Sequence, residues 1–202
     1  MFDFQKIYLI NLPHRIDRLM SAKEQAKKYG FEFEVFAGIY GIDFRTKYPE
    51  QNNNTNGCSA SHLQIYQRAK ILGLNNYMVL EDDFQINPDI ADIFPKVMQD
   101  LPTDWDMLYF GASHQQIPER ITSNIYKLKR SLTTHAYAVN LDNRFSEIIS
   151  KFDFSNTMDG VYADAHKDYN CYISNPPLVW QKDDYSDIEG RVMSYNWIKQ
   201  GI

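Results

Sequence analysis

Hydrophobic residues along the first part of the chain change between two spacings, and each spacing predicts one kind of element. Residues 6–12 form a β-branched and aromatic run that Pro13 closes, which predicts a buried strand. Over residues 15–29 the apolar residues recur at helical spacing, and Gly30 follows as a helix stop. The chain therefore begins with a strand, a short loop and a helix.

The next segments predict a second strand, a loop and a second helix. Over residues 31–35, aromatic and apolar residues alternate with glutamates, which predicts a half-buried strand and completes a βαβ start. Residues 43–56 are polar and rich in asparagine, which predicts a mobile loop able to close over a ligand. Ser59 or Ser61 is expected to cap the following helix, whose apolar stripe ends at Gly73.

Residues 77–84 are the most informative stretch, because four apolar residues lead into three acids. The apolar run is too short for a helix, so it predicts a buried central strand whose tip is Glu81, Asp82 and Asp83. Burying unpaired carboxylates is costly, unless the strand ends at a water-filled crevice where a divalent cation neutralises them. The stretch predicts a metal-assisted site, and an acidic surface turn is the alternative.

The later part of the chain predicts shorter elements with more β content. Helices are expected near residues 88–101, 141–152 and 159–169, strands near residues 105–111, 125–128, 133–139, 171–174 and 178–180, and a connecting loop at residues 117–123. Strands that alternate with helices early and dominate later predict an α/β fold. We expect a single domain with a mixed, mainly parallel sheet flanked by helices.

Length and charge narrow the class of protein. The 202 residues are 44% hydrophobic, which is enough for one domain with a substantial core. A formal net charge of -5 disfavours nucleic acid as a partner, since that binding rests on clustered lysine and arginine. The N-terminus lacks a targeting pattern, and no apolar stretch approaches the ~18 residues that span a bilayer. We expect a cytoplasmic protein without a transmembrane segment, and peripheral membrane contact is left open.

Five other side chains are candidates for chemistry. Arg15 and Arg18 lie where the first predicted helix begins, beside backbone N–H groups that favour phosphate oxygens, with surface salt bridges as the alternative. Cys58 and Cys171 are expected to be reduced thiols, and no cysteine–histidine set has zinc spacing. His62 is expected in the first turn of its helix, as a neutral capping or packing residue.

Five segments, in their order along the chain, resemble glycosyltransferase family 25, which includes bacterial lipooligosaccharide galactosyltransferases and collagen galactosyltransferases. The segments are residues 10–12 with Arg15, Asp17 and Arg18; Gly57 and Cys58 with Ser61 and His62; residues 80–83; residues 134–137; and Pro177 with Gln181, Ser186, Asp187 and Ile188. Two features depart from the family. The chain is short for a stand-alone member, and residues 37–41 match the family's Ala-x-Asp-Gly only loosely.

The resemblance implies a GT-A-like fold, with a nucleotide-sugar-binding half over about residues 1–112 and an acceptor-binding half over about residues 113–202. It implies inverting transfer of a hexose, galactose or glucose above all, from a UDP-sugar to a hydroxyl of a glycan, glycoprotein or glycolipid, assisted by Mn²⁺ or Mg²⁺. A protein that binds nucleotide sugars or glycans without catalysis is the alternative. A nucleotidyl- or phosphotransferase is disfavoured because the chain has no Walker-type loop, and a phosphatase or receiver-like domain because a lysine at a later strand end is lacking.

The implied chemistry assigns roles to the candidate residues. A departing diphosphate gains negative charge, which a metal ion and arginines stabilise. Asp83 is expected to bind the metal, and Glu81 to point the same way, toward the metal, a metal-bound water or the ribose, because side chains alternate along an extended segment. By the resemblance, the residues expected to bind the nucleotide sugar are Asn11, Arg15, Arg18, Ser61, Glu81, Asp82 and His135.

Inversion also needs a general base on the opposite side of the sugar, and the later half of the chain should supply it. Asp159 is the expected base, with Asp184 as the second choice. A structural cap on the short helix that begins at Gly160 is the rival role for Asp159. Trp180 is expected either in the core or stacked on a sugar face.

Overall fold

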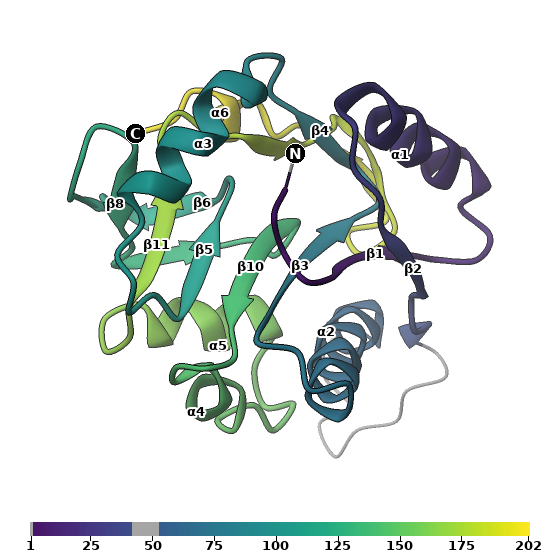
Figure 1. Ribbon diagram of the computed structural model, residues 1–202. Coiled ribbons are helices and arrows are strands. Elements are labelled where there is room, and N and C mark those ends of the chain that lie inside the picture. The colour runs from purple at the N-terminus through teal and green to yellow at the C-terminus, as the bar shows by residue number, and fades with distance from the viewer. Residues whose placement is uncertain (1, 42–52) are drawn as a thin grey trace.

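The computed structural model describes residues 2–41 and 53–202, and within them an eight-stranded sheet runs through the molecule (Figure 1). Its order is β2-β1-β3-β10-β5-β11-β8-β7. The strands are β1 Ile7–Asn11, β2 Glu34–Ala37, β3 Asn76–Glu81, β5 Met107–Tyr109, β7 Glu119–Arg120, β8 Ile125–Lys127, β10 Ala136–Asn140 and β11 Cys171–Ser174. Strands β10 and β8 run antiparallel to their neighbours, and the other six point one way. The predicted mixed, mainly parallel sheet is confirmed.

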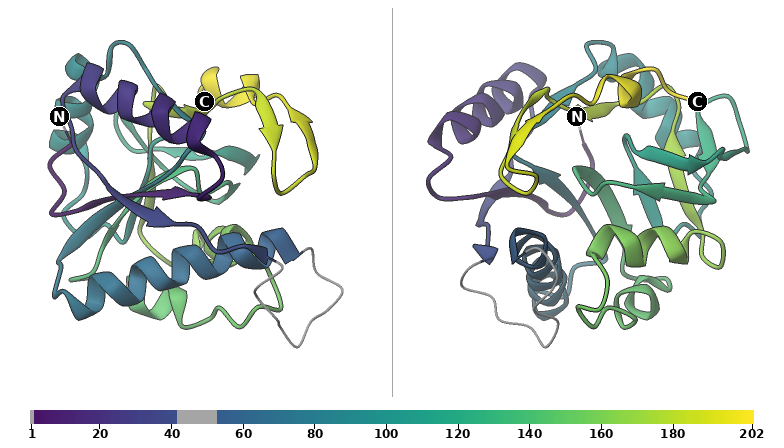
Figure 2. Two further views of the ribbon diagram at one scale, coloured as in Figure 1. Left: turned by 90° about the vertical axis from the view of Figure 1, so that its right-hand side faces the viewer. Right: turned by 180° about the vertical axis from the view of Figure 1, so that it is seen from behind.

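Helices cover both faces of this sheet. They are α1 Ile16–Tyr29, α2 Asn53–Ile71, α3 Ile90–Asp100, α4 Phe145–Ile149, α5 Met158–Ala165 and α6 Asn196–Lys199. Helices α1 and α3 lie on one face, and α2, α4 and α5 lie on the other (Figures 1 and 2). In β3, Met78 and Leu80 pack with the first group, whereas Tyr77 and Val79 pack with the second. The apolar run of β3 is continuous because both of its faces are buried. Among the described residues, no helix has the length and apolar character to cross a lipid bilayer.

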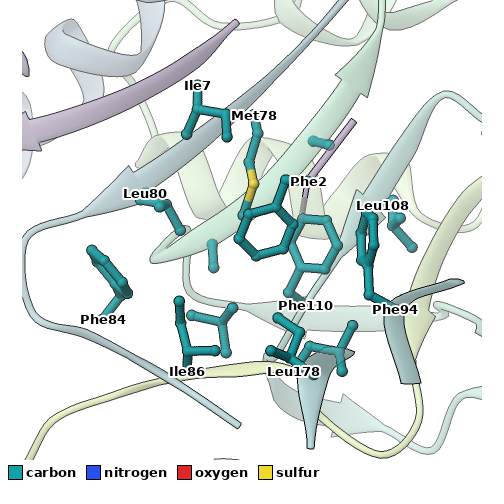
Figure 3. Packing of buried hydrophobic residues seen from close by; sticks show 14 of the residues in the cluster. Phe2, Ile7, Met78, Leu80, Phe84, Ile86, Phe94, Leu108, Phe110 and Leu178 are labelled. Carbon is teal, nitrogen blue, oxygen red and sulfur yellow. The ribbon is translucent and has the colours of Figure 1, made fainter. Parts of the chain in front are cut away.

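Aromatic rings fill the core between the sheet and the helices α1 and α3 (Figure 3). The ring centroid of Phe2 lies 5.1 Å from that of Phe94, nearly perpendicular to it, and 5.7 Å from that of Phe110. The Phe2–Phe94 pair is edge-to-face, a geometry that adds to the stabilisation that burial alone provides. The N-terminal segment is thereby anchored beneath α3, and β1 begins at a fixed position.

Three two-stranded sheets complete the described part of the chain: β4 Phe84–Ile86 with β12 Val179–Gln181, β6 Ser113–Gln116 with β9 Arg130–Leu132, and β13 Asp184–Ser186 with β14 Arg191–Met193. Because β4 follows the acids directly, its pairing with β12 sets Gln181 opposite Phe84. Trp180 donates from Nε1 to Gln85 Oε1 at 3.2 Å on the same sheet. The indole is thus half-buried against the protein and is absent from the cavity described below.

The strand predicted over residues 31–35 differs from the one observed. Phe31 is tied to the end of α1 by a backbone hydrogen bond and packs in the core, so the strand begins only at Glu34. In this edge strand Phe36 is the half-buried aromatic residue, whereas Val35 is 42% exposed. The sequence does alternate apolar and polar residues over this range, but Phe31 belongs to the segment that follows the end of α1 and not to the strand.

Helix α2 begins earlier than predicted. Residues 53–56 of the predicted loop form its first turn, and the rest of that loop prediction, up to residue 52, lies outside the described residues. Ser59 and Ser61 are therefore interior residues of the helix and not its cap, and His62 is beyond the first turn. Two smaller corrections concern the helix predicted over residues 141–152, which shrinks to α4, and the loop predicted at residues 117–123, which contains β7.

Candidate functional site

A cavity of about 560 Å³ opens where β1 and β3 end. The acidic turn after β3, the segment 38–41, the first turns of α2, the segments 132–134 and 157–159, and the hairpin β13–β14 form its wall. Open α/β sheets commonly bind ligands at the carboxyl ends of parallel strands. The predicted acidic strand tip therefore lies in a crevice, and the alternative of an exposed surface turn is wrong.

The three acids occupy a tight connection between two strands. Strand β3 ends at Glu81, and Asp82 and Asp83 form a turn that leads into β4. Their side chains are 19%, 9% and 11% exposed, respectively. Because the backbone turns here, the alternation of an extended segment stops, and all three residues line the cavity instead of two. Burial of three neighbouring carboxylates makes this turn the dominant electrostatic feature of the site.

Glu81 is held by a histidine and a threonine. Its Oε1 lies 3.3 Å from His62 Nε2 and accepts a hydrogen bond of 2.8 Å from Thr134 Oγ1. Burial alone would raise the pKa of Glu81, but the contacts with His62 and Thr134 hold the pKa below its usual value. His62 is itself fully buried, and its Nδ1 lies 2.9 Å from Tyr137 Oη. His62 is thus a packing residue, as expected, that also orients Glu81.

Asp82 forms the base of a buried polar network. Asn11 Nδ2 donates to Asp82 Oδ2 at 2.7 Å, and Arg18 NH1 donates to Asp82 Oδ1 at 2.9 Å. Burial raises the pKa of Asp82, while the contacts from Arg18 and Asn11 oppose that rise. Asn11 and Asp82 therefore position Arg18 in the cavity wall.

Asp83 is the least satisfied of the three acids. Its Oδ2 accepts a long hydrogen bond of 3.4 Å from Gln181 Nε2 and lies 3.6 Å from Arg18 NH1. Among the described residues, Asp83 Oδ1 and Gln181 Oε1 are buried without a hydrogen-bond partner. Burial and the charge of Glu81 raise the pKa of Asp83 to about 7, although Arg18 acts in the other direction. A group with these properties is poised to receive a positive ligand.

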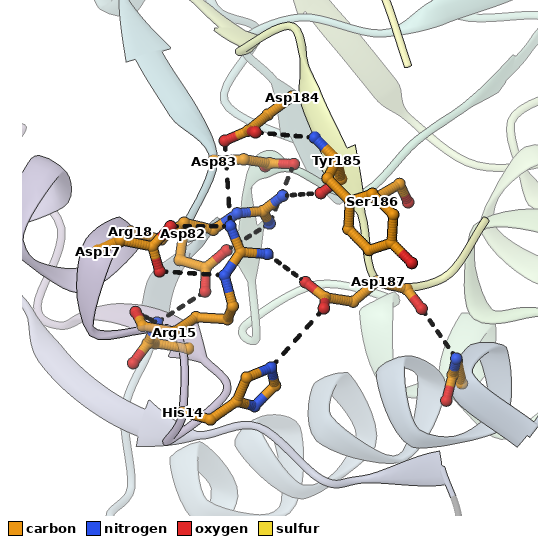
Figure 4. Close-up of polar contacts among 12 residues, drawn as sticks. His14, Arg15, Asp17, Arg18, Asp82, Asp83, Asp184, Tyr185, Ser186 and Asp187 are labelled. Atoms are coloured by element: carbon orange, nitrogen blue, oxygen red, sulfur yellow. Dashed lines mark hydrogen bonds and ion pairs between the residues drawn. The ribbon is translucent and has the colours of Figure 1, made fainter. Parts of the chain in front are cut away.

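Arg15 and Arg18 occupy different positions, as Figure 4 shows. Arg18 lines the cavity, and its NH2 donates to the carbonyl oxygen of Tyr185 at 2.6 Å. Arg15 lies behind that wall, where it donates to Asp17 at 3.0 Å and to Asp187 at 2.5 Å. The Arg18 side chain is 11% exposed and pairs with buried acids, which is not the surface salt bridge that was the alternative, whereas Arg15 does pair with Asp17, whose side chain is 65% exposed. Of the two, Arg18 is the one placed to meet a ligand in the cavity.

Asp159 lies in the wall formed by the start of α5. The N-cap of this helix is Thr157, whose Oγ1 accepts from Gly160 N at 3.1 Å, so the capping role considered for Asp159 is wrong. Asp159 instead accepts hydrogen bonds from the Thr157 hydroxyl and, at 3.4 Å, from Thr133 N. It shares the cavity with Asp83, as a base from the later half of the chain requires.

Four predicted residues are absent from the described cavity wall, namely Asn11, Arg15, His135 and Asp184. Asp184 Oδ2 lies 4.0 Å from Arg15 NH2, on the hairpin side. His135 is fully buried, and its Nε2 lies 3.1 Å from the carbonyl oxygen of Val179. Burial lowers the pKa of His135, so the ring is neutral and braces β12. The role of base expected for Asp184 and the donor-binding roles expected for Asn11, Arg15 and His135 stay predictions.

Ser61 borders the cavity as part of a close helix contact. Its Oγ donates to the carbonyl oxygen of Gly57 at 2.8 Å and accepts from Ile39 N at 2.9 Å. A Cβ at Gly57 would lie 2.4 Å from the carbonyl oxygen of Ile39, so only glycine allows this approach. Together these residues hold the segment 38–41 against α2, beside the acids.

Several residues of this site had no role assigned from the sequence. Gln181 and Asp187 belong to the segments that resemble the family, but only the hairpins at the end of the chain bring them to the acids and to Arg15. Cys58 and His62 lie one helical turn apart, and both approach Glu81. A four-residue spacing on a helix is the signal that could have linked Cys58 to His62.

The residues at the acidic turn fit an oxygen-preferring divalent cation. Hard cations such as Mg²⁺, and Mn²⁺ with them, take carboxylate and amide oxygens as ligands. Asp83 Oδ1 and Gln181 Oε1 supply one of each, buried and unpaired among the described residues. Glu81 is ionised beside them, because its pKa is lowered.

The sequence matches one family over most of its length. Residues 4–161 match the family described as "Glycosyltransferase family 25 (LPS biosynthesis protein)". This range includes the acidic turn and Asp159, and it ends before Gln181 and the hairpin β13–β14.

Named relatives share this part of the chain. A protein of Acanthamoeba polyphaga mimivirus named as a glycosyltransferase is 31% identical over 144 residues, covering 64% of this chain and 44% of its own length. Procollagen galactosyltransferase 1-A of Xenopus laevis is 25% identical over 137 residues, covering 57% of this chain and 22% of its own length. The chain thus spans less than half the length of these relatives.

Solved structures show more distant likeness. The galactosyltransferase LgtC, in complex with donor and acceptor sugar analogues, aligns with a TM-score of 0.46 at 11% identity, over 92% of this chain and 91% of its own. A glycosyltransferase involved in glycosylation of the major capsid of PBCV-1 aligns with a TM-score of 0.44 at 14% identity, over 81% of this chain and 74% of its own.

Proposed function

The chain belongs to glycosyltransferase family 25, and we propose that it transfers a hexose, galactose or glucose, from a UDP-sugar to a hydroxyl of a glycan, glycoprotein or glycolipid. One observation carries this proposal. Asp83, Arg18 and Asp159, which come from the turn after β3, from α1 and from α5, line a single cavity at the carboxyl edge of the sheet. The cavity therefore combines a cation-binding acid, a fixed positive charge and a candidate base.

The donor would bind on the side of the acidic turn. Asp83, with Gln181 and Glu81 beside it, would hold Mn²⁺ or Mg²⁺, which when bound stabilises negative charge on the leaving diphosphate. Arg18 adds a fixed guanidinium whose orientation is set by Asp82. Arg18 Nε is buried without a partner among the described residues, so this side chain retains a donor for a phosphate oxygen.

The acceptor would approach from the side of α5. Asp159 would accept the proton of the acceptor hydroxyl as that oxygen attacks the anomeric carbon, which inverts the configuration there. The hydrogen bonds from Thr157 and Thr133 fix the carboxylate in the wall, so the base is oriented before the acceptor binds. Geometry of this kind lowers the entropic cost of bringing three groups together.

A panel of UDP-sugars tests the activity directly. The purified protein is incubated with each donor and Mn²⁺, and both UDP release and thermal shift are measured. Stabilisation by one UDP-sugar together with UDP release supports the proposal. If a UDP-sugar stabilises the protein but no UDP is released with any acceptor tested, the result supports instead the alternative function, a nucleotide-sugar-binding protein of the same fold. No stabilisation by any nucleotide sugar contradicts both.

Asp83→Asn tests the metal assignment. The amide keeps the shape of the side chain but removes the charge that holds the ion, so Mn²⁺-dependent affinity for UDP should fall by more than ~100-fold. The apo protein should be as stable as the wild type or more so, because the amide relieves the burial of a charge and the repulsion from Glu81 that together raise the pKa of Asp83. Asp92→Asn, on the exposed face of α3, is the matched control and should bind normally. Unchanged Mn²⁺-dependent UDP affinity in Asp83→Asn would show that Asp83 does not bind the metal.

A further inference from the structure

A cysteine, a histidine and a glutamate meet at the inner end of the cavity. Cys58 and His62 lie four residues apart on α2, which places them on one face of that helix. Glu81 ends the neighbouring strand β3, and one potential ligand atom from each of the three residues lies within 4.8 Å of the others. We propose that Cys58, His62 and Glu81 form a second metal site, which shares Glu81 with the one at Asp83 and takes a thiophilic divalent cation such as Zn²⁺.

The spacing of the ligand atoms fits a tetrahedral ion. Bonds of about 2.0–2.1 Å from zinc to nitrogen and oxygen place neighbouring ligand atoms about 3.3–3.4 Å apart. His62 Nε2 and Glu81 Oε1 are 3.3 Å apart, so this pair can bind an ion without moving apart. Cys58 Sγ lies within 4.8 Å of both atoms, so a side-chain rotation or a shift of at most roughly 1 Å brings it to the zinc–sulfur bond length of about 2.3 Å and completes a three-ligand set.

The surrounding hydrogen bonds orient the ligands as a metal site requires. His62 Nδ1 lies 2.9 Å from Tyr137 Oη, so a proton on Nδ1 can be donated to that oxygen, which leaves Nε2 bare for a metal. Thr134 Oγ1 donates to Glu81 Oε1 at 2.8 Å and fixes the carboxylate. Both Tyr137 and His62 are fully buried, so the imidazole has little freedom to rotate away.

The ligand set selects against the cation expected at Asp83. A thiolate and an imidazole prefer Zn²⁺ over Mg²⁺ or Mn²⁺, whereas oxygen ligands alone prefer the latter. Three protein ligands leave one position of a tetrahedron open, and Cys58 and Glu81 both line the cavity, through which an ion and a fourth ligand can enter. Binding replaces the thiol proton by the metal and releases that proton to water.

Glu81 belongs to both sites, and this sharing has a functional consequence that rests on the proposed transferase activity. An ion held by Cys58 and His62 withdraws Glu81 from the acidic turn, so Zn²⁺ should antagonise Mn²⁺ at Asp83. Because Cys58 is the ligand that favours zinc, zinc would lower donor binding only when Cys58 is present.

Cobalt provides a spectroscopic test that does not depend on activity. Metal-free protein titrated with Co²⁺ should develop the visible bands of tetrahedral cobalt and a near-ultraviolet thiolate-to-cobalt charge-transfer band. Cys58→Ser should lose the charge-transfer band and bind Zn²⁺ at least ~10-fold more weakly, since a hydroxyl is a poor zinc ligand. Cys171→Ala removes the other free thiol, which is buried on β11, and should keep the band.

Each outcome of the cobalt test either supports or overturns the second metal site. A charge-transfer band that persists in Cys58→Ser, or that disappears in Cys171→Ala, overturns the site. If Cys58→Ser does not fold, X-ray absorption of zinc-loaded wild-type protein decides: one sulfur ligand supports the site, and only nitrogen and oxygen ligands overturn it. Zinc should also reduce Mn²⁺-dependent UDP binding in the wild type but not in Cys58→Ser. Failure of all UDP-sugar binding would contradict the proposed function and leave the cobalt result standing.

Discussion

At the scale of single residues, the strongest evidence for a bound cation is a pair of oxygen atoms. Among the described residues, Asp83 Oδ1 and Gln181 Oε1 are buried and accept no hydrogen bond. Leaving one buried acceptor unsatisfied costs about 1–3 kcal/mol. Two such atoms on residues that contact each other are unfavourable for a folded protein unless a positive ligand compensates for them.

The variant Gln181→Met tests whether the amide oxygen is a ligand. Methionine has a similar length and apolar volume but no hard oxygen, so Mn²⁺ affinity should fall about 10–100-fold. Isothermal titration with Mn²⁺ alone measures this without substrate. Gln116→Met, at an exposed position on β6, is the control and should bind as the wild type does. Equal Mn²⁺ affinity in Gln181→Met and the control would show that Gln181 does not bind the ion and contributes only to the fold.

The raised pKa of Asp83 predicts that Mn²⁺ affinity and the stability of the metal-free protein depend on pH. Burial raises its pKa to about 7, so below that pH the folded protein holds a proton that Mn²⁺ must displace. Mn²⁺ affinity should therefore rise with pH up to about 7 and then level, with proton release on binding only on the acid side. Stability of the metal-free protein should change in the opposite direction, falling as pH rises from the ordinary aspartate pKa of about 4 to about 7.

Titrations with Mn²⁺ in buffers of different ionisation enthalpy count the released protons. Asp83→Asn should abolish the pH-dependent proton release and flatten the stability profile over the same range. Proton release that persists in this variant would assign the titrating group to another acid.

Some residues of the site could be predicted from the sequence and others could not, for a physical reason. Three consecutive acids at the end of an apolar run mark a site because their burial has to be compensated, and that property is visible locally. Gln181 and Asp187 gave no such signal, since each is an ordinary polar residue until β12 or the hairpin β13–β14 brings it to a partner.

At the scale of elements, periodicity identified the strands and helices that are buried on a regular face. The predicted bounds of strand β3 and helix α1 agree with the observed bounds to within one or two residues, because the apolar run of β3 is continuous and bounded by polar residues and the pattern of α1 ends at Gly30. Strand β2 and the start of α2 were misplaced. Phe31 follows the end of α1, and the asparagine-rich residues 53–56 form the first turn of a helix that tertiary contacts stabilise despite weak local propensity.

Helix α5 places Asp159, and the cap of this helix makes the test of the base cleaner. Because Thr157 provides the cap, Asp159→Asn should leave stability within about 0.5 kcal/mol of the wild type. Turnover should fall by ~10²–10⁴, since an amide cannot accept the acceptor proton, while donor affinity stays unchanged.

The matched control for that variant is Asp164→Asn, at an exposed position later in the same helix. It should retain full turnover. If Asp159→Asn retains it as well, Asp184 becomes the next candidate, although Asp184 is absent from the described cavity wall. Loss of donor affinity and turnover together would indicate instead that Asp159 binds the donor.

At the scale of the whole molecule, the site depends on the two ends of the chain meeting. Arg15 and Arg18, at the start of α1, bind Asp187 and the carbonyl oxygen of Tyr185 in the C-terminal hairpin (Figure 4). Sequence could predict the sheet and its acidic edge from local patterns. It could not predict this closure, because an ion pair between residues 15 and 187 leaves no trace in the spacing of either segment.

Asp187→Asn tests that closure. The neutral amide removes an ion pair whose partners are 13% and 27% exposed, so the hairpin β13–β14 should loosen, with a global stability loss of about 1 kcal/mol. Hydrogen exchange should accelerate over Asp184–Met193 and remain unchanged in β1 and β3. Asp17→Asn is the matched control, because Asp17 pairs with the same arginine from within α1 and does not hold the hairpin. Faster hairpin exchange in Asp17→Asn, or none in Asp187→Asn, would show that contacts other than this ion pair fix the cavity wall.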